Sequence, residues 1–294
     1  MNYLLHIGIF FCIYSILSLS LNIAMGFTGL LNLGHVAFYA VGAYTSAILV
    51  KSGVPFIWAI LAAALIAALS SLLISVPSLR LKGHYFAIAA FGFGEILEAI
   101  IKNWTSLTRG PMGIYAIPKP EIFGFAFESI SEVFALYLII TAISVFVIYK
   151  IVNSPFGRVL KSIREDEIAA KALGKRTTAY KIEAVFIGAL FAGIAGSMYA
   201  HYVMYIDPGL SGLNILILVL SMVVVGGLGS VGGSILGAMV IFLIPEPLRF
   251  LQVSGATIAA LRQLIYSLLI ILMIMFMPEG LIKEKGFRRK KCSR

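Results

Sequence analysis

Charged residues are scarce in this chain of 294 residues. Only 12% are Asp, Glu, Lys or Arg, whereas 60% are hydrophobic, and the mean hydropathy is +1.00. A soluble domain of this composition would expose large apolar patches, so the lack of charge excludes that class. Several windows reach the roughly 20 apolar residues that cross a hydrocarbon core of about 30 Å. The composition therefore predicts an all-α, polytopic integral membrane protein in contact with a lipid bilayer.

Cysteine is nearly absent, which excludes a disulfide framework and a cysteine metal site. Cys12 falls within the first apolar stretch and Cys292 falls in the last residues of the sequence. No Ser, His and Asp arrangement can be assembled from neighbouring positions, so no enzyme activity is expected. A nucleotide cofactor is not expected either. In "LGKRTT", Arg176 occupies the position where a phosphate-binding loop needs Ser or Thr.

Acidic residues are fewer than basic ones, 13 against 23, which gives a formal charge of +10. The excess does not indicate nucleic-acid binding, because a membrane interior leaves no basic groove with aromatic side chains. The basic residues gather in a central loop, residues 153–181, and in a tail, residues 278–294. Basic loops beside apolar spans face the cytoplasm, so both segments are expected on the cytoplasmic side of the plasma (inner) membrane.

The apolar stretches predict about eight to ten spans in a single transmembrane domain, residues 1–294. Four of them follow the central loop, and an even number of crossings returns the tail to the same side. The candidate spans are residues 3–25, 36–50, 55–76, 84–101, 133–152, 182–204, 213–225, 231–244 and 261–277.

Two glycine-rich segments interrupt this pattern, at residues 26–34 and 226–233. We call them the first and second glycine breaks. Paired breaks in the two halves of a membrane chain indicate a translocation path. Close helix packing through small residues is the alternative. The path candidates in the breaks are Gly26, Gly29, Asn32, Gly34, Gly226, Gly227, Gly229, Gly232 and Gly233.

Two acidic residues fall within the predicted span at 84–101. Ionisable groups inside a bilayer usually have a function. Glu98 is expected to pair with Lys102 one helical turn later. Glu95 has no such neighbour, so it is a further path candidate, with a buried hydrogen bond as the alternative.

The central loop contains "SPFGRVLKSIREDEIAAKALG", which begins with a helix start at Ser154 and Pro155 and ends at Gly174. Its apolar residues do not form one stripe at helical spacing. The segment is therefore predicted to form two short helices with a bend near Glu165, a shape suited to docking. A solvated loop that only sets topology is the alternative.

Five segments resemble the permease subunits of branched-chain amino acid ABC importers. The segments are "NIAMGFTGLLNLGHVAFYAVGAY", "HYFAIAAFGFGEI", "SPFGRVLKSIREDEIAAKALG", "GLGSVGGSILGA" and "MPEGL". The chain length and the long loop at residues 102–131, expected outside the membrane, resemble the M-type member of the permease pair. The pattern of two alanines and a glycine in the central loop resembles the segment that grips the ATP-hydrolysing subunit in such importers. The resemblance implies ATPase coupling through Arg158, Arg164, Glu167, Ala169, Ala170 and Gly174.

The resemblance further implies ATPase subunits, a second permease subunit and an extracytoplasmic substrate-binding protein as partners. Leucine, isoleucine or valine would be the cargo. The alternative is a secondary amino acid transporter driven by an ion gradient without an ATPase. Such a transporter needs several buried carboxylates for its coupling ion, whereas the spans offer mainly Glu95.

Overall fold

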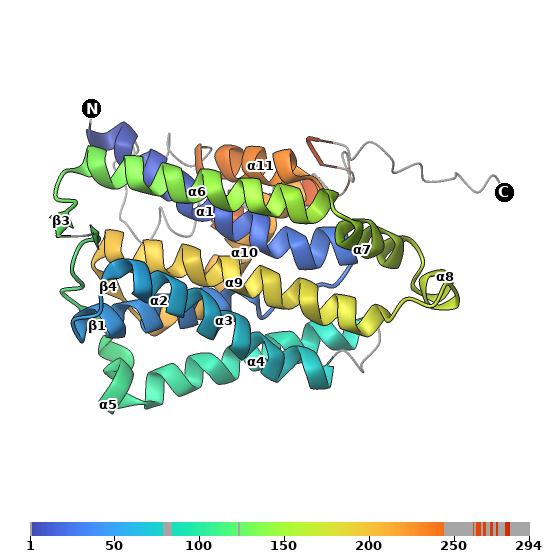
Figure 1. The fold of residues 1–294 in the computed structure, drawn as a ribbon, viewed down its shortest axis with the longest axis horizontal. Helices are drawn as coiled ribbons and strands as arrows, with labels where there is room; N and C mark the ends of the chain where they lie inside the picture. The colour runs from blue at the N-terminus through green and yellow to red at the C-terminus, as the bar shows by residue number, and fades with distance from the viewer. Residues whose placement is uncertain are drawn as a thin grey trace.

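The computed structural model describes residues 2–78, 84–122 and 124–243, together with single positions between 261 and 282. Over these residues the chain is a bundle of helices that run side by side (Figure 1). Among the described residues, five helices are long and apolar enough to cross a membrane, which confirms the all-α, polytopic prediction, while the number of eight to ten spans stays a prediction. The five helices are α1 (Asn2–Thr28), α3 (Phe56–Ser78), α6 (Ile130–Asn153), α9 (Thr177–Val203) and α10 (Leu213–Gly226), the last preceded by the 3-10 turn η2 (Pro208–Ser211).

Three further helices run alongside these five. They are α2 (His35–Lys51), α4 (His84–Asn103) and the short apolar α11 (Val231–Leu243). The observed helices agree with the predicted spans to within a few residues at most ends. The predicted span at 261–277 and the tail at 278–294 lie for the most part outside the described residues.

The centre of the bundle is held by helix α9, against which α1, α2 and α3 all pack. Small residues bring these helices close together. A Cβ atom added at Gly196 of α9 would lie 2.0 Å from the Tyr39 carbonyl oxygen of α2. A Cβ at Gly42 of α2 would lie 2.4 Å from the Gly193 Cα of α9. Lipid tails are as apolar as leucine, so helices in a membrane associate mainly by such close backbone approach.

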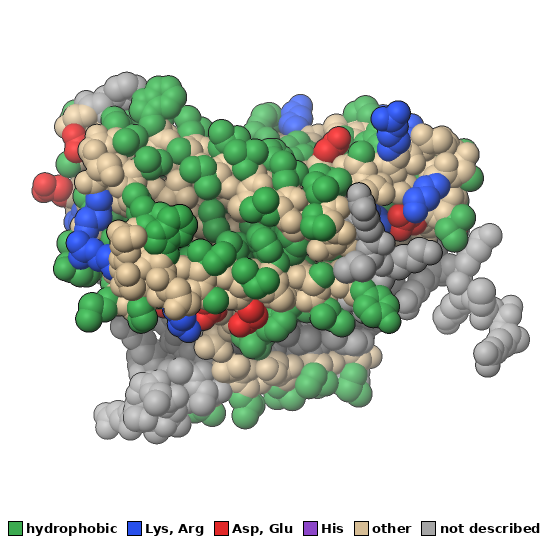
Figure 2. Space-filling model, turned by 90° about the horizontal axis from the view of Figure 1, so that it is seen from below, with side chains coloured by type: hydrophobic (Ala, Val, Ile, Leu, Met, Phe, Trp, Pro, Cys, Tyr) green, Lys and Arg blue, Asp and Glu red, His purple; other side chains and the backbone are tan. Residues whose placement is uncertain are grey.

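The outer helices separate small from large apolar side chains. In α3, Ala59, Ala63 and Ala67 are buried, whereas Leu65 and Leu73 are exposed. This arrangement suits a helix with lipid on one side and protein on the other. The face seen in Figure 2 is accordingly mostly hydrophobic, with most Lys and Arg toward the two ends of the molecule.

The two ends of the bundle differ in structure. Helices α7 (Pro155–Glu165) and α8 (Glu167–Ala172) of the central loop project from one end, and the N-terminus lies at the opposite end (Figure 1). The opposite end also carries two small antiparallel sheets that the sequence pattern did not predict, with β1 paired to β4 and β2 to β3. Its elements are α5 (Thr105–Thr108), η1 (Gly110–Met112), β1 (Ile114–Tyr115), β2 (Glu121–Ile122), β3 (Phe125–Ala126) and β4 (Tyr205–Ile206).

Candidate functional site

The central loop folds into two short helices, α7 (Pro155–Glu165) and α8 (Glu167–Ala172), as the sequence predicted. The Ser154 side chain accepts a hydrogen bond from the Gly157 amide and caps α7. Asp166 separates the helices, because its extended backbone ends α7 and its carboxylate accepts hydrogen bonds from the amides of Ile168 and Ala169. The bend near Glu165 therefore arises from a new helix cap.

Glu167 ties α8 to the start of α9. Its carboxylate lies 2.6 Å from the Lys181 ammonium and 3.0 Å from that of Lys171, and it accepts a hydrogen bond from the Thr177 hydroxyl at 3.1 Å. Burial raises the pKa of Glu167, but the bonds from the two lysines and Thr177 outweigh this and lower the pKa to about 2. Glu167 therefore braces the central loop from within the chain.

The surface of α8 exposes large apolar side chains at the end of the bundle. Ile168 is 81% exposed and Leu173 is 79% exposed, and Ala169 beside them is also exposed. Ala170, in contrast, is only 2% exposed and faces its own chain. Gly174 has a φ of +77° with no atom within 4 Å of an added Cβ, so it serves the left-handed turn rather than a close contact.

Arg164 joins the central loop to both glycine breaks. Its guanidinium donates hydrogen bonds to the Gly26 carbonyl at the end of α1 and, at 3.4 Å, to the Leu228 carbonyl after α10. An added Cβ at Gly29 would lie 3.6 Å from the Arg164 Cγ. Arg158, on the same helix, is exposed. The two predicted arginines therefore differ, since Arg164 points into the bundle.

The two breaks meet each other at Asn22 of α1, a fully buried residue that the sequence reasoning missed. Its amide nitrogen donates to the Ser230 carbonyl at 3.1 Å and to the Ser234 hydroxyl at 2.6 Å. Its oxygen accepts from the Gly229 amide at 3.0 Å. A Cβ at Gly26 would lie 1.6 Å from that oxygen. The sequence signal that could have identified Asn22 was a polar side chain within a predicted apolar span.

The second break is a close backbone contact. An added Cβ at Gly226 would lie 2.1 Å from the Gly233 carbonyl oxygen, and one at Gly233 would lie 2.4 Å from that of Gly226. A Cβ added at Gly280 would lie 2.3 Å from the Gly227 Cα, and one added at Gly232 would lie 3.5 Å from the Ile282 Cδ1. These distances favour the packing alternative for Gly226 and Gly233. Their place in a translocation path remains a prediction.

The far side of the first break packs against α4. A Cβ at Gly34 would lie 2.2 Å from the Ala90 carbonyl oxygen, and the Gly34 amide donates to the Asn32 side chain at 3.2 Å. The amide nitrogen of Asn32 is buried and has no partner among the described residues. Asn32 and Gly34 thus lie beside the helix that carries Glu95.

The two acidic residues of α4 have different environments. Glu98 pairs with Lys102 at 3.1 Å, which confirms the predicted ion pair. Glu95 is exposed on the surface of the single chain, and no hydrogen bond or ion pair joins it to the described residues. The described residues give Glu95 no buried hydrogen bond, and its place in the path stays a prediction.

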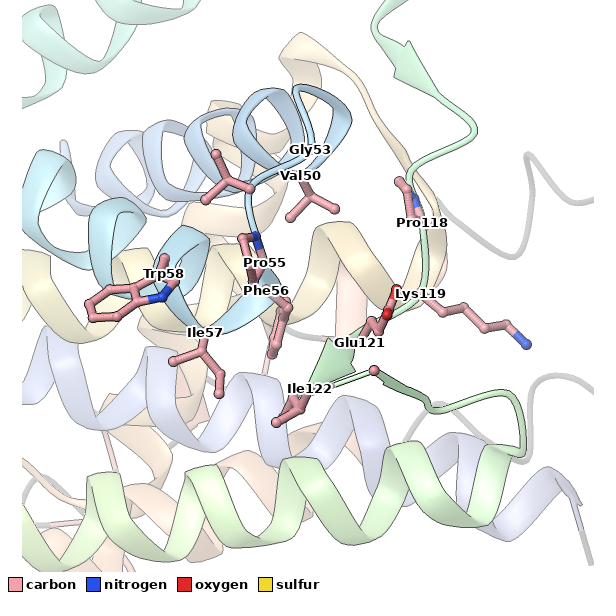
Figure 3. A pocket seen from close by; sticks show the side chains of 12 residues that line it. Val50, Gly53, Pro55, Phe56, Ile57, Trp58, Pro118, Lys119, Glu121 and Ile122 are labelled. Carbon is pink, nitrogen blue, oxygen red and sulfur yellow. The ribbon is translucent and has the colours of Figure 1, made fainter.

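A cavity of about 440 Å³ lies at the end opposite the central loop (Figure 3). The turn between α2 and α3 and the segment around β2 form its walls, and Phe56 and Ile122 line it whereas the Lys119 side chain extends away. Among the described residues no group of three His, Cys, Asp or Glu side chains could hold a metal ion.

Comparison of the sequence with known proteins identifies the family of this chain. The chain matches the family described as "Branched-chain amino acid transport system / permease component" over residues 3–277. It is 37% identical to the high-affinity branched-chain amino acid transport system permease protein LivM of Salmonella typhimurium, over 92% of this chain and 68% of that protein. It is 28% identical to a probable LivM of Methanocaldococcus jannaschii, over 94% and 92% of the two chains. It is 24% identical to the LivH permease of Escherichia coli, over 92% and 91%. No solved structure matches the chain.

Proposed function

The chain belongs to the permease components of branched-chain amino acid transport systems, and from that premise we propose that it is the membrane subunit of an ATP-driven importer. It would form the path for leucine, isoleucine or valine together with a second permease subunit. Its driving force would come from separate ATPase subunits, and an extracytoplasmic binding protein would deliver the cargo.

The observation that carries the ATPase assignment is the exposed apolar surface of α8. Ile168 and Leu173 are large apolar side chains, yet each is about four-fifths exposed. Both lie on the charged central loop, beyond the ends of the spans. Apolar side chains projecting into water from a short, internally braced helix are suited to a hydrophobic pocket on a partner protein. Because the loop is rich in Lys and Arg, we assign it and the tail to the cytoplasm, where ATP is available.

Arg164 supplies a route from that surface to the path. When the ATPase subunits close, they would push on residues 158–174, and α7 would shift as a rigid element. The Arg164 guanidinium holds the carbonyls of Gly26 and Leu228, so such a shift acts on both glycine breaks. Arg158 and Ala169 would contact the ATPase directly, and their exposure on the same loop supports this.

The test replaces Ile168 and Leu173 with Asp in the complete transporter. We expect the ATPase to be lost from the purified complex, because a carboxylate would be buried unpaired in its pocket. Met112→Asp is the matched control, since Met112 is 80% exposed and lies just before β1, which is at the opposite end of the bundle (Figure 1). If the ATPase copurifies with the double variant as it does with the wild type, the docking assignment is wrong.

The rival function is ion-gradient-driven transport by the chain alone. It predicts leucine uptake into vesicles that contain only this polypeptide and no nucleotide. The importer predicts that uptake requires the ATPase, the second permease subunit and ATP. Uptake measured with and without these partners separates the two functions.

A further inference from the structure

The exposure of Glu95 conflicts with a lipid-facing position. Glu95 follows His84 by eleven residues in α4, which at about 1.5 Å per residue puts it about 16 Å along a helix that the sequence predicts to span the membrane. Its side chain is exposed in the single chain and has no partner among the described residues. A charged group facing lipid at that depth is costly, so in the working assembly this face of α4 meets something other than lipid.

An apolar pocket of about 340 Å³ opens on the same side of α4. Its lining is entirely apolar and comes from α4, α10 and the end of the first glycine break. The lining residues are Leu33, Phe91, Leu213, Leu216, Ile217 and Leu220. A pocket of this size accommodates a small organic molecule.

Glu95 lies one helical turn from this pocket. Phe91 lines it, and residues four apart on a helix lie on one face with their Cβ atoms about 5–6 Å apart. Glu95 itself does not line the pocket, but it lies one turn beyond Phe91 on the predicted span. Glu98, a further turn along the same face, is paired with Lys102 and is not available in the same way.

From this juxtaposition we infer that the pocket and Glu95 form the site that holds the amino acid during its passage. The branched aliphatic side chain occupies the pocket between α4 and α10, and the α-ammonium group binds the Glu95 carboxylate. The inference rests on the proposed transport function and names where that function contacts its substrate.

Charge complementarity selects this occupant. A lipid acyl chain would fill the apolar pocket but leave Glu95 unpaired. A helix of the second permease subunit would need a Lys or Arg at the same membrane depth. A zwitterionic aliphatic amino acid brings both the apolar group and the cation in one molecule. Because transient holding suits a path, one charged contact and one open pocket are sufficient.

The first experiment measures leucine uptake by the complete transporter in proteoliposomes, with Glu95→Gln in this chain. Loss of a charge-assisted contact is expected to raise the KM for uptake about ten-fold or more, with the ATPase subunits still bound. Glu98→Gln is the matched control, because it removes a carboxylate from the same helix. It is expected to leave the KM within about two-fold of the wild type.

The second experiment narrows the pocket with Ile217→Phe, a partly exposed position on α10. Leucine has a longer side chain than valine, so its uptake is expected to fall several-fold more than that of valine. Equal loss for both amino acids, or no loss, contradicts the pocket assignment.

The outcomes separate this inference from the proposed function. If the wild-type complex takes up no branched-chain amino acid, the proposed function fails. If the wild type is active and Glu95→Gln has the same KM, the substrate site is wrong. Loss of the second permease subunit from the Glu95→Gln complex also overturns the inference, since the carboxylate would then serve that interface.

Discussion

Replacement of Arg164 by Met tests how the central loop communicates with the glycine breaks. Met retains an apolar stem of similar length but has no donor, so the contacts to the Gly26 and Leu228 carbonyls disappear. A hydrogen bond from a charged donor contributes roughly 1.5–3 kcal/mol, and the bond to Leu228, at 3.4 Å, is long. We therefore assign about 2–4 kcal/mol to the pair, which corresponds to a roughly thirty-fold to several-hundred-fold change in the equilibrium that they support.

The assay compares leucine uptake and ATP hydrolysis by the complete transporter. We expect Arg164→Met to lower uptake roughly thirty-fold or more, while the ATPase stays bound and continues to hydrolyse ATP. Lys150→Met is the control, because Lys150 is an exposed basic residue in the last turn of α6, three residues before the central loop begins. Wild-type uptake by Arg164→Met would refute the proposed route. Simultaneous loss of the ATPase would also refute it, since Arg164 would then act in docking.

Three further predictions address the breaks, the tip of the central loop and the packing of the bundle. Gly229→Leu should abolish uptake but leave the complex assembled, because Gly229 has a φ of +81° and its amide binds Asn22; normal uptake would remove this segment from the path. The pKa of Glu167 is about 2, below its ordinary 4.5, so its contribution to stability is fully present above about pH 4.5 and is lost as the pH falls toward 2. The protection of the amides of residues 167–177 from hydrogen exchange, relative to an unfolded chain at the same pH, should fall as the pH is lowered across that range. Glu167→Gln should remove this pH dependence. Gly196→Ala should lower the melting temperature by several degrees through overpacking of about 1–3 kcal/mol against Tyr39, whereas Gly92→Ala, with open space around it, should not.

Hydropathy and capping residues predicted most of the helices because both act locally. The span expected at 133–152 is observed as Ile130–Asn153, and the one expected at 213–225 as Leu213–Gly226. The break between α7 and α8 was also predicted, and Asp166 explains it. The Glu98 and Lys102 pair followed from helical spacing alone. Each of these features depends on residues within a few positions of one another.

The contacts of the candidate site could not be predicted in this way. Arg164 and Gly26 are 138 positions apart, and Asn22 and Gly229 are 207 apart. The family resemblance assigned both Arg164 and Glu167 to coupling with a partner ATPase. In the structure, the guanidinium of Arg164 turns into the bundle and the carboxylate of Glu167 binds Lys181. Which way a long polar side chain turns depends on tertiary neighbours that no local pattern encodes.

The position of Arg164 has a physical reason in the ends of two helices. The last carbonyls of a helix lack an internal partner and carry partial negative charge. Gly26 belongs to the last turn of α1, and Leu228 follows the end of α10. The Leu30 amide, which could have bound Gly26, binds the Ala24 carbonyl instead. One guanidinium from the central loop thus satisfies acceptors at both ends. A motion of α7 that withdraws the Arg164 guanidinium removes the donor from both carbonyls at once. Both glycine breaks therefore respond to a single displacement.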